Sequence, residues 1–276
     1  MKIFDLKIKY VPSIISEDNF KKIILFLKNK AFFISDDTLN PKEFKKFLNI
    51  INKVSRTKKP LAYIINKKFF YKSDFFINKN VLIPRYETEL IVEEVLKFDL
   101  VNKNVLDLCC GSGCIGISLK QEFNDINLYL SDYSKSALKV CKKNLRIKKM
   151  KAKIFYSNFL DFIFEKNLKM DFILINPPYI NKNDINIEKN VKLFEPWMAL
   201  FAKDNGLFFY KVLFKNLEKL FLLNNNLVII SEFGFNQKEE IELLFNSKGV
   251  RYNLEFKKDF SNHWRYFVLK NGDSNG

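Results

Sequence analysis

From about residue 104 onward, short apolar runs alternate with amphipathic segments, and this alternation limits the possible folds more than any other feature of the sequence. Branched and aromatic apolar runs predict strands, whereas apolar residues at helical spacing predict helices. The expected strands are 104–109, 126–132, 153–158, 170–176, 226–232, 251–256 and 264–270, and the expected helices are 134–145, 207–223 and one from about Gln237. This order predicts a doubly wound α/β sheet with an antiparallel element at its end, and ligands should bind at the carboxyl ends of its first strands.

The part of the chain before this pattern is more basic. Residues 1–80 hold 18 Lys or Arg against 7 Asp or Glu, whereas residues 81–276 hold 29 against 24. Ser16 can cap one helix and Pro41 can open another, because apolar residues recur at helical spacing after each of them. The charge and the helical pattern together indicate a separate small domain, although a basic run is often only a solvated face and here also fits a chain rich in Lys, Asn, Ile and Phe.

The stretch at residues 69–84 separates the two patterns. Its aromatic and β-branched residues, broken by a polar Asn-Lys-Asn, indicate strands or a hairpin. We therefore expect a helical domain at residues 1–66 and a catalytic domain at residues 67–276, with a hairpin linker at about 67–84.

Composition excludes several classes of protein. No uncharged apolar run approaches the roughly 20 residues that cross a bilayer, so no membrane association is expected. The start of the chain interleaves Asp5, Lys7 and Lys9 with apolar residues, unlike a secretory signal. The expected compartment is the cytoplasm.

The cysteines and the single histidine argue against two further kinds of site. Cys109, Cys110, Cys114 and Cys141 lack the spacing of a disulfide framework, so free thiols are expected. They also lack CxxC spacing, and the only histidine is His263, so no metal is expected. A lone histidine near a strand start does not favour Ser-His or Cys-His nucleophilic catalysis either.

A glycine loop follows the first strand of the α/β pattern. Gly111, Gly113 and Gly116 are three of only eight glycines in the chain, and they lie where a strand turns into a helix. Glycine permits a tight turn and lets a ligand approach the backbone closely. Asp132, at the end of the next strand, is suited to accept hydrogen bonds from both hydroxyls of a ribose. The pair indicates a nucleoside cofactor, and the glycines alone would also fit a dinucleotide.

The second motif decides between these cofactors. Asn176-Pro177-Pro178-Tyr179 follows the strand that ends at Ile175, and a hydride-transfer enzyme has no need of it. An amide or aromatic amine nitrogen is a poor nucleophile, because its lone pair is delocalised. The side-chain oxygen of Asn176 and the carbonyl of Pro177 can accept from the two N–H bonds of such a group and aim its lone pair at an electrophilic methyl. The two prolines stiffen the loop, and Tyr179 can pack over the planar group. This chemistry points to S-adenosylmethionine.

Several stretches make the sequence resemble the peptide-chain release-factor glutamine methyltransferases. The NPPY motif, Lys59–Ile64 with Phe69 and Phe70, and the stretch Ile83–Glu89, which reads IPRYETE, match signatures of that family. A later segment also echoes the family, with Phe194-Glu195-Pro196, Ala199-Leu200 and Gly206-Leu207. The resemblance implies a Rossmann-like fold and methylation, by S-adenosylmethionine, of the glutamine side-chain nitrogen in the GGQ motif of class-1 release factors.

The resemblance also implies roles for single residues. The cofactor-binding residues would be Cys109, Cys110, Gly111, Ser112, Gly113, Asp132, Phe159 and Asn176, and the residues that bind the target amide would be Asn176, Pro177, Pro178 and Tyr179. Asn176, Pro177 and Tyr179 would carry catalysis. The chain departs from the family at Cys109 and Cys110, at Asn158 in place of an Asp that faces adenine, and at Tyr86 in place of a proline. Arg85 and Glu89 would either shape the cofactor lid or form a stabilising ion pair.

Three alternative functions stay open. A ribosomal-protein glutamine methyltransferase would use the same amide geometry, and a nucleic-acid adenine methyltransferase would use the same NPPY chemistry. No target-recognition domain follows the catalytic strands, so we do not expect nucleic acid as a partner. A noncatalytic binding module would have no need of both Asp132 and the NPPY motif. The basic domain at residues 1–66 is the expected element that recognises the release factor, because a glutamine side chain alone offers little surface for discrimination.

Overall fold

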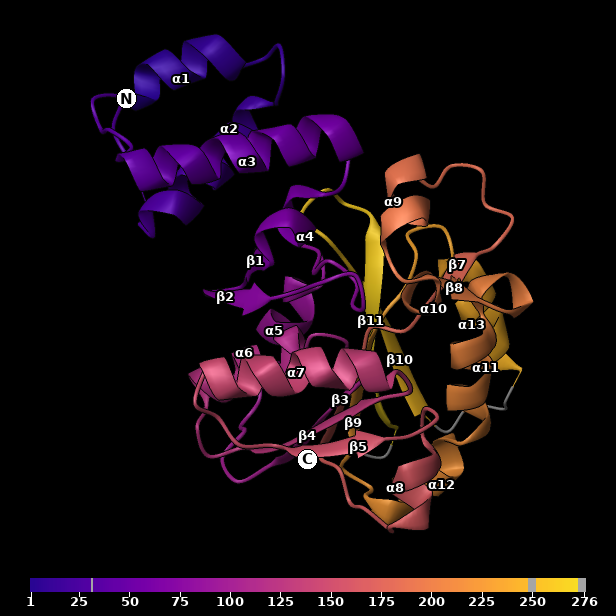
Figure 1. Ribbon diagram of the computed structural model, residues 1–276. Coiled ribbons are helices and arrows are strands. Elements are labelled where there is room, and N and C mark those ends of the chain that lie inside the picture. The colour runs from indigo at the N-terminus through magenta and orange to yellow at the C-terminus, as the bar shows by residue number, and fades with distance from the viewer. Residues whose placement is uncertain (31, 248–251, 273–276) are drawn as a thin grey trace. The chain divides into compact units, whose positions relative to one another are not determined.

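The computed structural model describes residues 1–30, 32–247 and 252–272, and the chain divides into two compact units (Figure 1). The first unit comprises Met1–Lys67 together with Glu188–Phe194. The second comprises Lys68–Ile187 and Glu195–Gly276. The short segment Glu188–Phe194 therefore groups with the N-terminal residues, although it follows the NPPY motif in the sequence.

The first unit is helical. Its helices are α1 (Ile3–Tyr10), α2 (Glu17–Lys28), α3 (Pro41–Thr57), α4 (Leu61–Ile65) and α9 (Lys189–Phe194). The Asn19 N–H donates to Ser16 Oγ at 3.2 Å, which confirms the expected cap of α2. Pro41 opens α3 as expected, behind a capping box made by Asn40 and Glu43. The core is apolar and aromatic, and Phe47 packs edge-on against other rings within it.

The stretch after this unit contains a short pair of strands. β1 (Lys67–Phe70) and β2 (Ser73–Phe76) form a two-stranded sheet. The chain then runs without regular structure to α5 (Glu89–Val95), so strands occupy only the first part of the stretch where they were expected.

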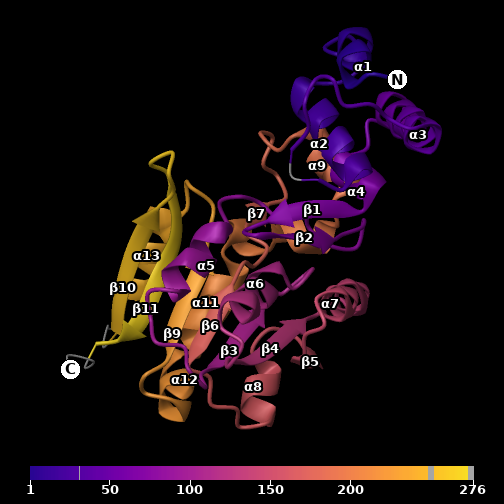
Figure 2. The same ribbon diagram turned by 90° about the vertical axis from the view of Figure 1, so that its left-hand side faces the viewer.

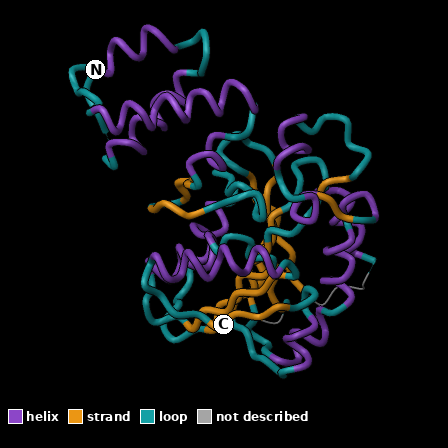
Figure 3. The backbone as a smooth tube through the Cα atoms, viewed as in Figure 1, coloured by secondary structure: helices purple, strands orange, loops and turns teal. Residues whose placement is uncertain are grey.

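The second unit is built on a seven-stranded sheet (Figure 3). Its strands are β3 (Asn104–Leu108), β4 (Asn127–Asp132), β5 (Lys153–Tyr156), β6 (Phe172–Ile175), β9 (Val228–Glu232), β10 (Tyr252–Lys258) and β11 (Trp264–Asn271). They lie in the order β10-β11-β9-β6-β3-β4-β5. The five strands from β5 to β9 are parallel, and β11 and β10 add antiparallel pairs at one edge. The expected doubly wound α/β sheet is confirmed.

Helices cover both faces of this sheet, as Figure 2 shows. On one face, α5 packs with α6 (Cys114–Glu122) and α7 (Lys135–Ile147). On the other face lie α8 (Asp161–Glu165), α11 (Phe208–Lys215), α12 (Leu217–Leu223) and α13 (Lys238–Asn246). Successive residues of a strand point to opposite faces, and accordingly Leu174 belongs to the first core and Ile175 to the second.

One expected helix is wrong in its extent. Residues 207–223 form two helices, α11 and α12, because Asn216 leaves the helical conformation at φ −107° and ψ 6°. Its side-chain nitrogen donates to the Val212 carbonyl at 2.8 Å, and such local bonding by Asn competes with the helix ladder. Arg251, expected to begin a strand, lies outside the described residues.

Short elements follow the NPPY motif. They are β7 (Ile180–Asn181), α10 (Trp197–Leu200), β8 (Phe201–Ala202) and a 3-10 turn at Asp204–Gly206. β7 pairs in parallel with β8, which ties the chain after the motif to the segment before α11. Among the described helices, none is long and apolar enough to cross a bilayer.

Candidate active site

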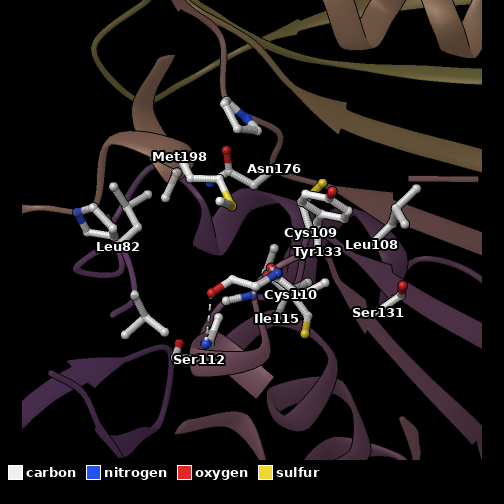
Figure 4. A pocket seen from close by; sticks show the side chains of 18 of the residues that line it. Leu82, Leu108, Cys109, Cys110, Ser112, Ile115, Ser131, Tyr133, Asn176 and Met198 are labelled. Carbon is white, nitrogen blue, oxygen red and sulfur yellow. Dashed lines mark hydrogen bonds between the residues drawn. The ribbon is translucent and has the colours of Figure 1, made fainter. Parts of the chain in front are cut away.

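A pocket opens at the carboxyl ends of β3, β4 and β6, where the topology of the sheet predicts a ligand site. Cys110, Ser112 and Ile115 lie on one side of it, and Asn176 and Met198 lie across from them (Figure 4). The glycine loop and the NPPY motif therefore face a common space.

The glycine loop has a tightly turned backbone. Cys109, Gly111 and Gly113 all have left-handed φ angles, of 61°, 54° and 78°. A Cβ added to Gly111 would meet no atom within 4 Å, so the backbone there borders open space in the pocket. A Cβ added to Gly113 would lie 2.8 Å from Cys141 Sγ, and Gly113 is not among the described residues that line the pocket. The first glycine thus leaves room for a ligand, whereas the second permits packing inside the protein.

Cys109 is the strained member of this loop. A non-glycine residue in the left-handed region costs about 1–2 kcal/mol. Burial raises the pKa of the Cys109 thiol well above its ordinary value. The pKa of Cys110 is also raised well above its ordinary value, chiefly by a hydrogen bond with Cys141. All four cysteines are free thiols, as expected.

Asp132 lies at the end of β4 and lines the pocket. The Gly111 N–H donates to its Oδ2 at 2.8 Å, and the Ser134 N–H donates to its Oδ1 at 2.7 Å. Burial raises the pKa of Asp132, while these backbone hydrogen bonds oppose the rise. A carboxylate has about four acceptor positions, so Asp132 keeps acceptor capacity for the hydroxyls of a ligand.

The NPPY loop begins directly after β6. The Asn176 side-chain nitrogen donates to Thr88 Oγ1 at 3.1 Å, and this leaves the amide oxygen for a ligand. Pro178 also lines the pocket, whereas Pro177 and Tyr179 are not among the described lining residues. The Tyr179 hydroxyl donates to Glu232 Oε1 at 3.0 Å, and burial raises the pKa of Tyr179 above its ordinary value.

Comparisons with known proteins show the family of this chain. Residues 86–222 match the family model of the methyltransferase small domain. A release factor glutamine methyltransferase from Mycoplasma mycoides is 43% identical over 239 residues, which is 86% of this chain and 84% of the relative. One from Borreliella burgdorferi is 40% identical over 244 residues, covering 84% of this chain and 82% of the relative. This chain belongs to the release factor glutamine methyltransferase family.

Solved structures show the same fold at low identity. A methyltransferase from Pyrococcus furiosus superimposes with a TM-score of 0.52 at 12% identity, covering 85% of this chain and 99% of that protein. The family's Rossmann-like sheet is thus present here, as the resemblance implied.

The other residues that line the pocket are suited to S-adenosylmethionine, the methyl donor of this family. Ser131 Oγ lines the pocket, is buried, and has no hydrogen-bond partner among the described residues. Buried polar atoms are nearly always hydrogen-bonded, so this atom favours a polar ligand group nearby. Phe159 packs edge-on against Phe209 with ring centroids 5.1 Å apart and gives an apolar wall suited to adenine. Asn158 is exposed, and its side-chain nitrogen donates to Asp161 at 3.2 Å.

Two stretches that resemble the family meet beside the pocket. Arg85 Nη2 donates to Glu195 Oε1 at 2.6 Å, and the Ile83 N–H donates to Glu195 Oε2 at 2.9 Å. Glu195 is buried, so the ion pair holds the IPRYETE stretch to the Phe-Glu-Pro stretch. For Arg85, the structure therefore shows an intramolecular ion pair. Glu89 Oε1 is buried without a hydrogen-bond partner among the described residues.

Residues outside the pocket lining contact the backbone of the NPPY loop. The Gln237 side-chain nitrogen donates to the Tyr179 carbonyl at 2.9 Å, and the Gly234 N–H donates to Gln237 Oε1 at 3.0 Å. A Cβ added to Gly206, which has a φ of 91°, would lie 2.1 Å from the Tyr179 carbonyl oxygen. Only glycine fits this close approach.

The sequence did not point to Thr88 and Glu232 as site residues. Thr88 lies inside the IPRYETE stretch, and Glu232 is the last residue of β9. A polar residue at the carboxyl end of a central strand was the available signal for Glu232, because such ends border the ligand site.

Proposed function

We propose that this chain transfers a methyl group from S-adenosylmethionine to the side-chain amide nitrogen of the glutamine in the GGQ motif of class-1 release factors. The observation that carries the proposal is Asn176, whose side-chain oxygen is left for a ligand in the pocket that the glycine loop and Asp132 also border. The identity to release factor glutamine methyltransferases over most of the chain supports the choice of substrate.

Different residues around the pocket would bind different parts of S-adenosylmethionine. Asp132 would accept from the ribose hydroxyls, and Phe159 would pack beside the adenine. Gly111 would border the methionine portion, because nothing within 4 Å occupies the space that a side chain would take there. Cys109, Cys110 and Ser112 would line the rest of this cradle. Bound S-adenosylmethionine supplies an electrophilic methyl on its sulfonium.

The NPPY loop would prepare the nucleophile. Asn176 Oδ1 and the Pro177 carbonyl accept from the two N–H bonds of the glutamine amide and turn its lone pair toward the methyl. Pro178 shapes the wall beside them, and Tyr179 is anchored through Glu232 with its ring beside the loop. Catalysis would then be chiefly the positioning of two reactants. The sulfonium would leave as a neutral thioether and the methylated nitrogen would lose one proton to water, so that no base with a tuned pKa is needed.

The helical first unit would recognise the release factor. Lys42, Lys45, Lys46, Lys53 and Arg56 are exposed on α3 and recur at helical spacing. Residues so spaced lie along one face of a helix. This basic stripe of α3 is suited to an acidic surface on a protein partner and would steer encounter in a salt-dependent way.

Transfer of label tests the proposal directly. The protein is incubated with methyl-labelled S-adenosylmethionine and, separately, a purified class-1 release factor, ribosomal proteins or DNA. Label should appear on the release factor and be absent from a matched release factor whose GGQ glutamine is alanine. Label on ribosomal protein or DNA with none on the release factor would refute the proposed substrate.

A further inference from the structure

A buried carboxylate, Glu232, anchors Tyr179 and also makes a second hydrogen bond that the chemistry above does not use. Glu232 is 2% exposed at the end of β9. The Thr88 hydroxyl donates to Glu232 Oε2 at 2.6 Å, and the Tyr179 hydroxyl donates to Glu232 Oε1 at 3.0 Å. Thr88, also 2% exposed, in turn accepts from the Asn176 side-chain nitrogen at 3.1 Å. Glu232, Thr88 and Asn176 thus form a continuous chain of hydrogen bonds from the protein interior to the pocket.

The charge of Glu232 determines which group donates in each of these hydrogen bonds. An ionised carboxylate only accepts hydrogen bonds, so the Thr88 hydroxyl hydrogen must point at Glu232. Thr88 Oγ1 then offers only a lone pair to Asn176, which must present its N–H. An Asn176 amide turned by half a rotation would set its oxygen against the oxygen of Thr88 with no hydrogen between them.

The ionised form of Glu232 has local support. Burial raises the pKa of Glu232, but its hydrogen bonds from Thr88 and Tyr179 and the positive charge of Arg265 oppose the rise, whereas Glu87 adds to it. Both hydroxyls also donate to separate carboxylate oxygens. Each carboxylate oxygen of Glu232 thus has its own hydroxyl partner, which is the arrangement that an ionised carboxylate makes, against the upward effect of burial on its pKa.

We propose that Glu232 and Thr88 are positioning residues that set the rotation of the Asn176 amide, so that its oxygen and not its nitrogen faces the substrate. The inference rests on the proposed function, because the oxygen matters only if it accepts from a substrate N–H. A neutral side chain in place of Glu232 could donate a hydrogen bond to Thr88 as well as accept one. The Thr88 hydroxyl could then either accept from Asn176 or donate to it, so both rotations of the Asn176 amide would be possible. The same carboxylate also anchors Tyr179 and so holds both ends of the NPPY motif.

Removing the Thr88 hydroxyl tests the proposal. Thr88→Val keeps the shape of the side chain and should lower kcat at least about tenfold, with affinity for S-adenosylhomocysteine within about twofold of the unmodified protein. Thr88→Ser restores the hydroxyl and should keep kcat within about threefold. Glu232→Gln should fall between these two variants. If Thr88→Val or Glu232→Gln turns over as fast as the unmodified protein, the proposal fails.

A double-mutant cycle separates positioning from a loss of stability. Once Asn176→Ala has removed the group to be oriented, adding Thr88→Val should change single-turnover rates less than about twofold. Equal losses with and without Asn176 would overturn the proposal. Ser118→Ala is the matched control, because it also deletes a buried hydroxyl but lies on α6 outside this chain of hydrogen bonds.

An NMR measurement tests the rotation without any methyl acceptor. In the protein saturated with S-adenosylhomocysteine, the side-chain amide of Asn176, assigned by its loss in Asn176→Ala, should give one sharp pair of signals. Thr88→Val should broaden or double that pair, and an unchanged pair would refute the inference. If the unmodified protein fails to methylate release factor, the proposed function fails, and the NMR result still decides the positioning role.

Discussion

Asn176 combines an engaged nitrogen with an available oxygen, and at the scale of single residues this asymmetry makes a sharp prediction. Asn176→Ala should reduce kcat by about a hundredfold or more while leaving S-adenosylhomocysteine affinity nearly unchanged, because the lost interaction orients the acceptor nitrogen and not the donor. Asn176→Asp should retain part of the activity, since its oxygen still accepts. Turnover assays and calorimetry measure the two effects. A fully active Asn176→Ala enzyme would refute the amide-positioning mechanism.

Asp107 predicts a pH dependence of stability. Burial, with the nearby charge of Asp132, raises the pKa of Asp107 from 3.8 to about 7, although the Gly116 N–H donates to it. The folded state therefore holds this proton more tightly than the unfolded state does. The stability that the proton supplies is complete below the unfolded pKa and is lost as the pH rises through 7.

Substitution of Asp107 by Asn isolates that effect. The free energy of unfolding of the unmodified protein, relative to Asp107→Asn, should fall by about 2–3 kcal/mol between about pH 5 and about pH 8. Chemical denaturation of both proteins across this range measures the difference. A difference that stays constant would show that Asp107 has an ordinary pKa in the folded protein.

At the scale of elements, two glycines on different loops make a matched pair. A Cβ on Gly206 would meet the Tyr179 carbonyl at 2.1 Å, whereas a Cβ on Gly111 would meet no protein atom within 4 Å. Gly206→Ala should therefore displace the NPPY loop and lower kcat or stability, whereas the glycine loop makes none of the close contacts of Gly206. Gly111→Ala should cost only about 1 kcal/mol of stability from its positive φ but weaken donor binding.

Thermal unfolding and calorimetry with S-adenosylhomocysteine distinguish the two substitutions. The expected pattern is loss of affinity in Gly111→Ala and loss of turnover or stability in Gly206→Ala. If Gly111→Ala binds the ligand as tightly as the unmodified protein does, the cofactor does not lie against Gly111.

Some of the helices and strands could be predicted from the sequence, and others could not. The parallel strands were predictable because their apolar runs are continuous and bounded by turns. The cap at Ser16 was predictable because Ser16 lies just before helical spacing begins. The break at Asn216 was not, since it depends on one side chain bonding its own helix. The contact of Thr88 with Glu232 joins residues 144 positions apart, which no local pattern encodes.

At the scale of the whole molecule, the first unit carries a basic stripe that the catalytic chemistry does not use. In the described part of the chain, Lys42, Lys45 and Lys46 form no ion pair, and all three are exposed on α3. Deleting residues 1–66 would test recognition crudely, because α9 groups with those residues and would lose its packing partners. Changing surface charge while keeping the unit folded is the sharper test.

We expect Lys42→Gln, Lys45→Gln and Lys46→Gln together to lower kcat/KM on intact release factor about tenfold at low salt, and less as salt screens the attraction. Methylation of a short GGQ peptide should not change, since a short peptide lacks the acidic protein surface that the stripe is proposed to attract. The matched control substitutes Lys139, Lys142 and Lys149, which are exposed residues of the second unit, by Gln and removes the same charge. Equal losses in the two triple variants would mean that only net charge matters. Normal activity of the α3 variant on intact release factor would show that the stripe is not the recognition element.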